Sequence, residues 1–222
     1  MANWCSTTIG IKAETKDTEA VAQLEVLRTL AESVIHQKAV NCDAGWLGFL
    51  LQNQGIDPDG ISSRGFIQDV SEIKTAGTLT YILVDVEDTW SPHLDLWDKL
   101  LALPAFNKLS YVVKAEEGGC QVFVNTDADG DIFPERFVLD YGAKTLQSSG
   151  VEYDYVYYKS FQDLLDACKE LFGVTDVVSM KDLFYKLSDY AEDHVDDIEF
   201  INIHPFQGIF EKPPIKLTDE ML

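Results

Sequence analysis

The segment 125–131 has the residue types and spacing of a calcium-binding loop. Oxygen-bearing side chains stand at its first, third, fifth and seventh positions, which are Asn125, Asp127, Asp129 and Asp131. Gly130 at the sixth position permits a sharp turn, but the twelfth position, which should be a bidentate Glu, is Arg136. Asp and Gly also favour tight turns between strands. We therefore expect a hairpin turn here and keep a weak Ca²⁺ site as the alternative.

Histidine and cysteine show no spacing that is typical of catalysis or metal binding. The four cysteines, Cys5, Cys42, Cys120 and Cys168, are far apart and form no CxxC pair, so we expect reduced, mostly buried thiols. None of the four histidines stands in an HExxH spacing, and we expect His93 to lie at the surface or at a helix start. Nucleophile elbows, P-loops and dinucleotide-binding glycine patterns are absent from the sequence.

The chain is strongly acidic. Asp and Glu number 38 against 17 Lys and Arg, which gives a formal net charge of −21. Such a charge repels phosphate backbones and anionic lipid and attracts basic proteins. We therefore expect no direct binding to nucleic acid or membranes, and we expect any charged partner to be a basic protein. The bland alternative is that the acidity serves solubility.

Acidic residues gather near the end of the chain. They are Glu192, Asp193, Asp196, Asp197 and Glu199, with Asp182 and Asp189 upstream. A surface of this kind can bind a basic protein in the way that a DNA-mimicking inhibitor does, with carboxylates in the place of phosphates. We expect a solvated helix face here and keep the binding surface as the alternative.

The first two-thirds of the chain alternate between the periods of strands and helices. Apolar residues recur every three or four positions from 18 to 35, as on one face of a long helix. Ser91-Pro92 has the residue types of a helix start. Strands are expected at 4–13, 65–73, 78–87 and 109–115, and helices at 18–35, at 46–51 and after Ser91. The resulting order, β-α-β-β-α-β, predicts an α+β fold with a ferredoxin-like split β-α-β sandwich.

A C-terminal extension of helices and strands follows. We expect a hairpin of strands 120–125 and 136–141, a strand at 151–158, two amphipathic helices from 161 and 180, and a strand at 198–203. Tyr153, Tyr155 and Tyr157 alternate with Glu152 and Asp154, which favours packing under the helices over RNA binding. We expect a first domain at 1–145 and an extension at 146–222 that packs on it and ends in a Pro-containing tail.

Three short motifs resemble the YubB-like family of bacterial proteins, which plasmids, phages and chromosomes encode. They are Asn3-Trp4-Cys5-Ser6, Thr89-Trp90-Ser91-Pro92 and Glu116-Glu117-Gly118-Gly119. The resemblance implies a ferredoxin-like domain and a bacterial origin, and it brings no catalytic residue with it. We expect the motif residues Asn3, Trp4, Cys5, Trp90, Ser91 and Pro92 to be structural, with the two tryptophans packed together. The segment 46–61 and the C-terminal helices depart from the family pattern.

No cationic region followed by an apolar one opens the sequence, and no apolar stretch approaches membrane-spanning length, so we expect a soluble, cytoplasmic protein. The leading functional hypothesis is a non-enzymatic interaction protein that needs no cofactor and binds a basic protein. The alternative is a Ca²⁺- or Mn²⁺-dependent binding protein or hydrolase that uses the 125–131 loop.

Overall fold

The computed structural model of the chain describes residues 3–40, 42–144 and 151–208. Within these ranges the chain is an α+β protein with five helices and two antiparallel sheets. It divides into two compact units: the first extends to Ile132 and the second is Phe133–Gln207. No helix in these ranges is long and apolar enough to cross a membrane.

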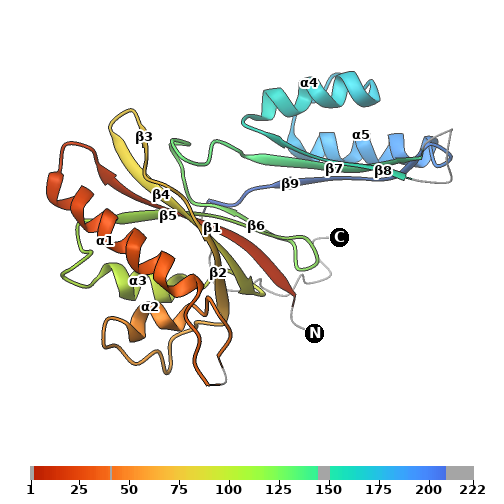
Figure 1. The fold of residues 1–222 in the computed structure, drawn as a ribbon. Helices are drawn as coiled ribbons and strands as arrows, with labels where there is room; N and C mark the ends of the chain where they lie inside the picture. The colour runs from red at the N-terminus through yellow and green to blue at the C-terminus, as the bar shows by residue number, and fades with distance from the viewer. Residues whose placement is uncertain (1–2, 41, 145–150, 209–222) are drawn as a thin grey trace. The chain divides into compact units, whose positions relative to one another are not determined.

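The first unit contains the larger sheet (Figure 1). Its strands are β1 (Trp4–Glu14), β2 (Gly65–Val70), β3 (Lys74–Ala76), β4 (Leu79–Thr89), β5 (Ser110–Glu117) and β6 (Val122–Asn125). They lie in the order β2-β4-β1-β5-β6, and β3 pairs with β4. The central strand β1 pairs with β4 over its whole length, from Trp4 opposite Thr89 to Glu14 opposite Leu79.

Three helices lie on one face of this sheet: α1 (Thr18–Ile35), α2 (Gly48–Gln52) and α3 (Leu94–Leu101) (Figure 1). Helix α1 begins after Asp17, whose carboxylate accepts the backbone N–H groups of Glu19 and Ala20 at 3.1 Å. Its apolar stripe is fully buried against the sheet, where alternate residues of β1 and β4 point inward. The buried stripe includes Leu24, Leu27 and Ala31.

The start of α3 differs from the expected one. The helix begins at Leu94 with His93 at the N-cap position, so the prediction that Ser91 caps it and Pro92 opens it is wrong. His93 makes no side-chain capping bond, because its ring is hydrogen-bonded to Ser62 and Arg64.

The second unit is a three-stranded sheet covered on one face by two helices (Figure 1). Its elements are β7 (Phe137–Lys144), β8 (Val151–Tyr158), α4 (Phe161–Phe172), α5 (Met180–Asp193) and β9 (Ile198–Pro205). Ser160 and Ser179 cap the two helices by accepting backbone N–H groups. The core is separate from that of the first unit and includes Leu139, Leu164, Cys168, Leu183, Leu187 and Ile203.

The hairpin expected for this region is wrong. Strand β6 pairs with β5, and β7 pairs with β8 and β9, so the predicted hairpin of 120–125 with 136–141 does not form. The compact units consequently divide between Ile132 and Phe133, ahead of the expected boundary at residue 145. The sequence signal failed because both segments have the β-branched and aromatic residues of strands, and that composition does not specify a partner.

The tyrosines of β8 also lie elsewhere than expected. Tyr153, Tyr155 and Tyr157 are exposed, whereas Tyr158, on the opposite face of the strand, packs against the helical core. Tyr153 stacks on Phe200 of β9, with ring centroids 5.9 Å apart. The three tyrosines therefore lie on the open face of the sheet rather than under the helices.

Neighbouring residues of α1 test the assignment of its buried face. We expect Leu27→Ala to lower the free energy of unfolding by about 2–5 kcal/mol, because Leu27 is fully buried. Val26→Ala removes less volume from a side chain that is 57% exposed, so the expected change is within about 0.5 kcal/mol. Urea denaturation of both variants measures the difference, and equal losses would contradict the assignment.

Candidate functional site

The three sequence motifs meet at one end of the larger sheet. The register of β1 and β4 places Trp4 opposite Thr89 and Cys5 opposite Asp88. The backbone N–H of Trp90 donates to the carbonyl oxygen of Asn3 at 2.9 Å, which extends this pairing beyond the strands. Segments that are far apart in sequence thus share one sheet end.

The third motif forms a turn at the same end. The Glu117 carboxylate is buried and accepts the backbone N–H groups of Gly119, at 3.0 Å, and of Cys120. The Asn3 side-chain amide lies 3.6 Å from the Cys120 sulfur, within range of a weak hydrogen bond. Glu117 therefore has a structural task, which is to hold the turn that follows β5.

Trp90 has an unusual backbone conformation. Its φ angle is 71°, in the left-handed region that bulky residues rarely adopt. Its side chain is 47% exposed, and that of Trp4 is 50% exposed. Trp4 packs on Phe66, with ring centroids 6.0 Å apart. The ring contact of Trp4 is thus with Phe66 of β2, whereas the sequence predicted that it packs with Trp90.

Asp88 is a carboxylic acid in the core. The side chain is 0% exposed, and neither of its oxygens has a hydrogen-bond partner among the described residues. Burial raises the pKa of Asp88 from 3.8 to about 7, and the Thr7 hydroxyl and the His93 backbone N–H offset a smaller part of this effect without making well-formed hydrogen bonds. Opposite Asp88, β2 carries Gly65, where a Cβ atom would lie 2.5 Å from the Asp88 carboxylate. Glycine is needed there to let β2 approach.

His93 is buried beside Asp88, with its Nε2 atom 4.0 Å from the nearer carboxylate oxygen. Nε2 lies 3.0 Å from the Arg64 carbonyl oxygen, and Nδ1 lies 2.8 Å from the Ser62 hydroxyl. Burial lowers the pKa of His93, so the neutral ring is favoured at neutral pH. In that form Nε2–H donates to Arg64 and Nδ1 accepts from Ser62. His93 therefore stands at the start of α3, as one of the two expectations has it, but it is buried rather than at the surface and its side chain does not cap the helix.

Cys5 is buried at the same sheet end as Asp88 and His93, but it lacks the low pKa of a nucleophilic thiol. Burial, with smaller contributions from the nearby charges of Asp88 and Glu117, raises the pKa of its thiol to about 12, despite the opposing hydrogen bond from Thr7. Reactive cysteines need a lowered pKa, which this surrounding does not provide. Cys5 therefore packs as a small core residue. The four cysteines are free; Cys5 and Cys168 are buried, Cys42 is intermediate and Cys120 is exposed.

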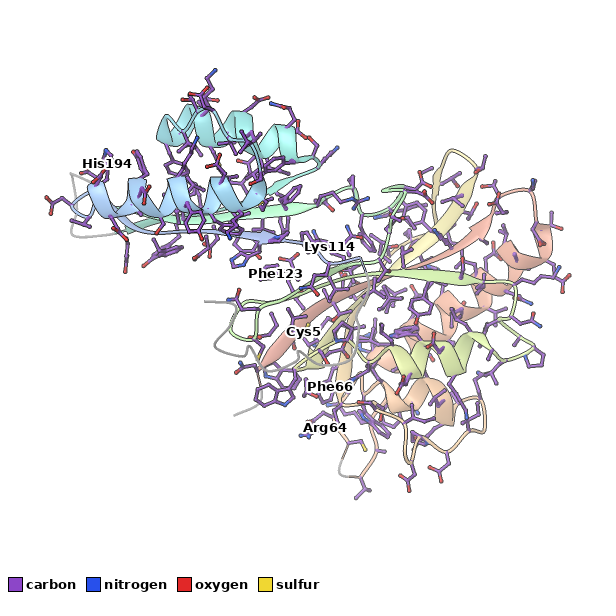
Figure 2. All side chains as sticks on the ribbon, turned by 180° about the vertical axis from the view of Figure 1, so that it is seen from behind. Cys5, Arg64, Phe66, Lys114, Phe123 and His194 are labelled. Carbon is purple, nitrogen blue, oxygen red and sulfur yellow. The ribbon has the colours of Figure 1, made fainter. Side chains whose placement is uncertain are left out.

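A pocket of about 290 Å³ lies at this end of the first unit. Its walls are Trp4, Cys42, Asp43, Trp46, Arg64, Phe66 and Thr89. Residues 45–47 position Trp46 by pairing with the edge strand β2: Ile67 N–H donates to the Gly45 carbonyl, and Leu47 N–H to the Gly65 carbonyl. Figure 2 labels two of these lining residues, Arg64 and Phe66. Thr89 lines the pocket and directly follows Asp88 in the chain. It therefore links the pocket to the buried side chains of Asp88 and His93.

The 125–131 loop connects β6 of the first sheet to the second unit and is not a hairpin turn. Asn125 and Asp127 are buried and hold the loop itself: Asn125 Oδ1 accepts the Asp127 N–H, and Asp127 Oδ2 accepts the Ile132 N–H at 2.7 Å. Asp129 and Asp131 are exposed. No three His, Cys, Asp or Glu side chains within the described ranges are placed to hold a metal ion.

Sequence reasoning missed Asp88, Arg64 and the aromatic pocket. One signal was available, because Ile82, Val84 and Val86 define the inward face of β4, and continuing that alternation places Asp88 on it. The pocket gave no such signal, because its walls come from four separate parts of the chain.

No family model, curated protein or solved structure matches the chain. The site is therefore interpreted from its own geometry.

The buried Asp88 carboxyl makes stability depend on pH. Its pKa is higher in the folded protein than in the unfolded chain, so the stability that its protonated form contributes is lost as pH rises from about 4 to 7. Between pH 5 and pH 8 we expect the native protein to lose about 2–3 kcal/mol more unfolding free energy than Asp88→Asn does. Urea titrations at both pH values measure this, and equal losses would show that Asp88 does not titrate as described.

Proposed function

We propose that this chain is a non-enzymatic interaction protein that binds a basic protein partner. The observation that carries the proposal is an exposed group of carboxylates around the C-terminal end of α5. This group, called here the acidic turn, consists of Asp189, Glu192, Asp193, Asp196, Asp197 and Glu199. None of its members makes an ion pair with another residue in the described ranges.

The acidic turn is electrostatically unfavourable in the isolated chain. A helix C-terminus carries partial negative charge and is stabilised by cations, yet the last turn of α5 contains no basic residue. The first turn of the same helix contains Asp182, where a negative charge is favourable and where its carboxylate accepts the Val178 N–H. Figure 2 marks this end of α5 by its C-cap residue, His194. A basic partner would relieve the repulsion, which supports a binding role over a purely solvating one.

The same proposal includes a fold family and a compartment. The strand order β2-β4-β1-β5, with α1 and α3 as the crossover helices, supports a ferredoxin-like first unit. The meeting of the three motifs at one sheet end supports membership of the YubB-like family of bacterial, mobile-element-associated proteins. A cytoplasmic location would allow the cysteines to stay reduced.

The alternative, a metal-dependent activity of the 125–131 loop, has no comparable support. Asn125 and Asp127 direct oxygen atoms to the backbone of their own loop. The exposed carboxylates of Asp129 and Asp131 lack the bidentate partner that calcium loops place at their twelfth position.

Neutralising the acidic turn tests the proposal directly. We expect replacement of its six residues by Asn or Gln to weaken binding of a peptide of alternating Lys and Arg about tenfold or more at low salt, and to reduce the salt dependence of binding. Isothermal titration calorimetry at two salt concentrations measures both effects. The matched control neutralises six exposed carboxylates of the first unit: Glu14, Glu25, Asp57, Asp59, Asp69 and Asp95. Equal weakening by the control would mean that only net charge matters, which contradicts a specific acidic surface.

The helix-end argument predicts two substitutions of opposite sign. Asp193→Asn should raise the midpoint of thermal unfolding of the second unit by about 1–3 °C at low ionic strength, because it removes repulsion at the α5 C-terminus. Asp182→Asn should lower that midpoint, because it removes charge from the N-terminal end. Calorimetry at low and high salt checks both, since salt should diminish the gain. A loss of stability in Asp193→Asn would contradict the argument.

A further inference from the structure

We infer that the 290 Å³ pocket of the first unit receives an arginine side chain of the basic partner. This inference deepens the proposed function and rests on it. It adds a second contact site, in the first unit, that recognises one side chain rather than a general positive charge.

The size of the pocket favours a single side chain. Pockets for drug-sized ligands and cofactors typically measure roughly 300–1,000 Å³, so this pocket lies at the lower limit. Three of its walls are aromatic, Trp4, Trp46 and Phe66, and they come from β1, the segment before α2, and β2. Aromatic faces carry partial negative charge and bind guanidinium groups by stacking and by cation–π attraction.

The exposure of Trp4 supports the same conclusion. Half of its surface remains open, although its ring already contacts Phe66 at 59°. Tryptophan is among the residues most enriched at binding hot spots, where it is covered only in the complex. Trp46 is held by its own packing, edge-on to Phe49 with centroids 5.2 Å apart, so this wall is preorganised.

The local charge favours a cation. Asp43 lines the pocket, and Glu87 lies opposite Phe66 across the strands. Arg64 is the one basic residue among the described lining residues. Its guanidinium makes no hydrogen bond, ion pair or ring contact with the rest of the described chain, so it does not occupy the aromatic faces itself. An anion bound by Arg64 is the competing possibility, and it predicts the opposite response to substitution.

The test compares a blocked Gly-Arg-Gly peptide with its citrulline counterpart, which keeps the shape and loses the charge. Binding is measured by calorimetry on the full chain. We expect the arginine peptide to bind about fivefold more weakly to Trp4→Leu and to Asp43→Asn than to the native protein. Arg64→Ala should bind it equally well or better, and Trp4→Phe should retain most of the affinity. The citrulline peptide should bind none of them measurably.

Trp90→Leu is the matched control, because Trp90 is as exposed as Trp4 but does not line the pocket. Its affinity should stay native. Because Asp43 is exposed, Asp43→Asn also tests the pocket without threatening the fold. If Arg64→Ala instead abolishes binding of a blocked Gly-Glu-Gly peptide that the native protein binds, the pocket is an anion site and the inference is overturned.

The acidic-turn variant separates this inference from the proposed function. If that variant loses the Lys-Arg peptide while the pocket variants bind both peptides like the native protein, the proposed function stands and the pocket inference fails. If the pocket variants lose the arginine peptide while the acidic-turn variant binds the Lys-Arg peptide normally, the pocket stands and the acidic turn is not the partner surface.

Discussion

The pairing of β1 with β4 is the constraint on which the first unit depends. It runs in one register from Trp4 opposite Thr89 to Glu14 opposite Leu79, and β5 pairs with the other side of β1. Because the side-chain period of a strand is two, this register decides which residues enter the core. A slip by one residue would expose Ile9 and Ile11 and bury the polar alternation of the outer face. The polar residues at the Trp4 end of the sheet are brought together because the same register continues to that end.

At that end of the sheet, the register places an ionisable side chain where an apolar core residue would otherwise stand. Asp88 occupies an inward position of β4, and Gly65 is the neighbour that makes room for it. A buried carboxyl without hydrogen bonds is costly when ionised, and proteins retain such groups where something other than stability is served. The neutral His93 beside it holds the Ser62–Arg64 segment instead of sharing a charge. Two pocket walls, Arg64 and Phe66, come from β2 and the residue before it. They therefore lie next to the buried side chains of Asp88 and His93.

The negatively charged side chains differ in their structural roles. Some carboxylates have structural tasks, as Asp17, Asp127 and Glu117 do by accepting backbone N–H groups. The acidic turn has none, and it stands where the helix dipole opposes it. Solubility does not require charges at this helix end, because it is served equally well at any exposed position. Carboxylates that accept backbone N–H groups thus differ from those of the acidic turn. This difference distinguishes the acidic turn from the other acidic residues of the chain.

The sequence by itself determined the elements. Apolar periodicity located α1 at its observed bounds and β8 likewise, and it predicted the α+β class, because these signals are local and arise from the residues that they describe. It could not determine partners. The strands at 122–125 and 137–144 both have strand-forming residues, yet they belong to different sheets, since that composition indicates a strand and leaves its neighbour open.

Only the tertiary structure decided the candidate sites. The pocket joins Trp4, Trp46 and Phe66, which no spacing in the sequence relates. The 125–131 loop shows the converse: its residue types allowed a weak Ca²⁺ site as the alternative to a hairpin turn, but the fold buries Asn125 and Asp127 and directs oxygens of both to backbone N–H groups. The physical reason is common to both cases. The chemistry of a side chain depends on what surrounds it, and those surroundings come from long-range pairing that local sequence does not encode.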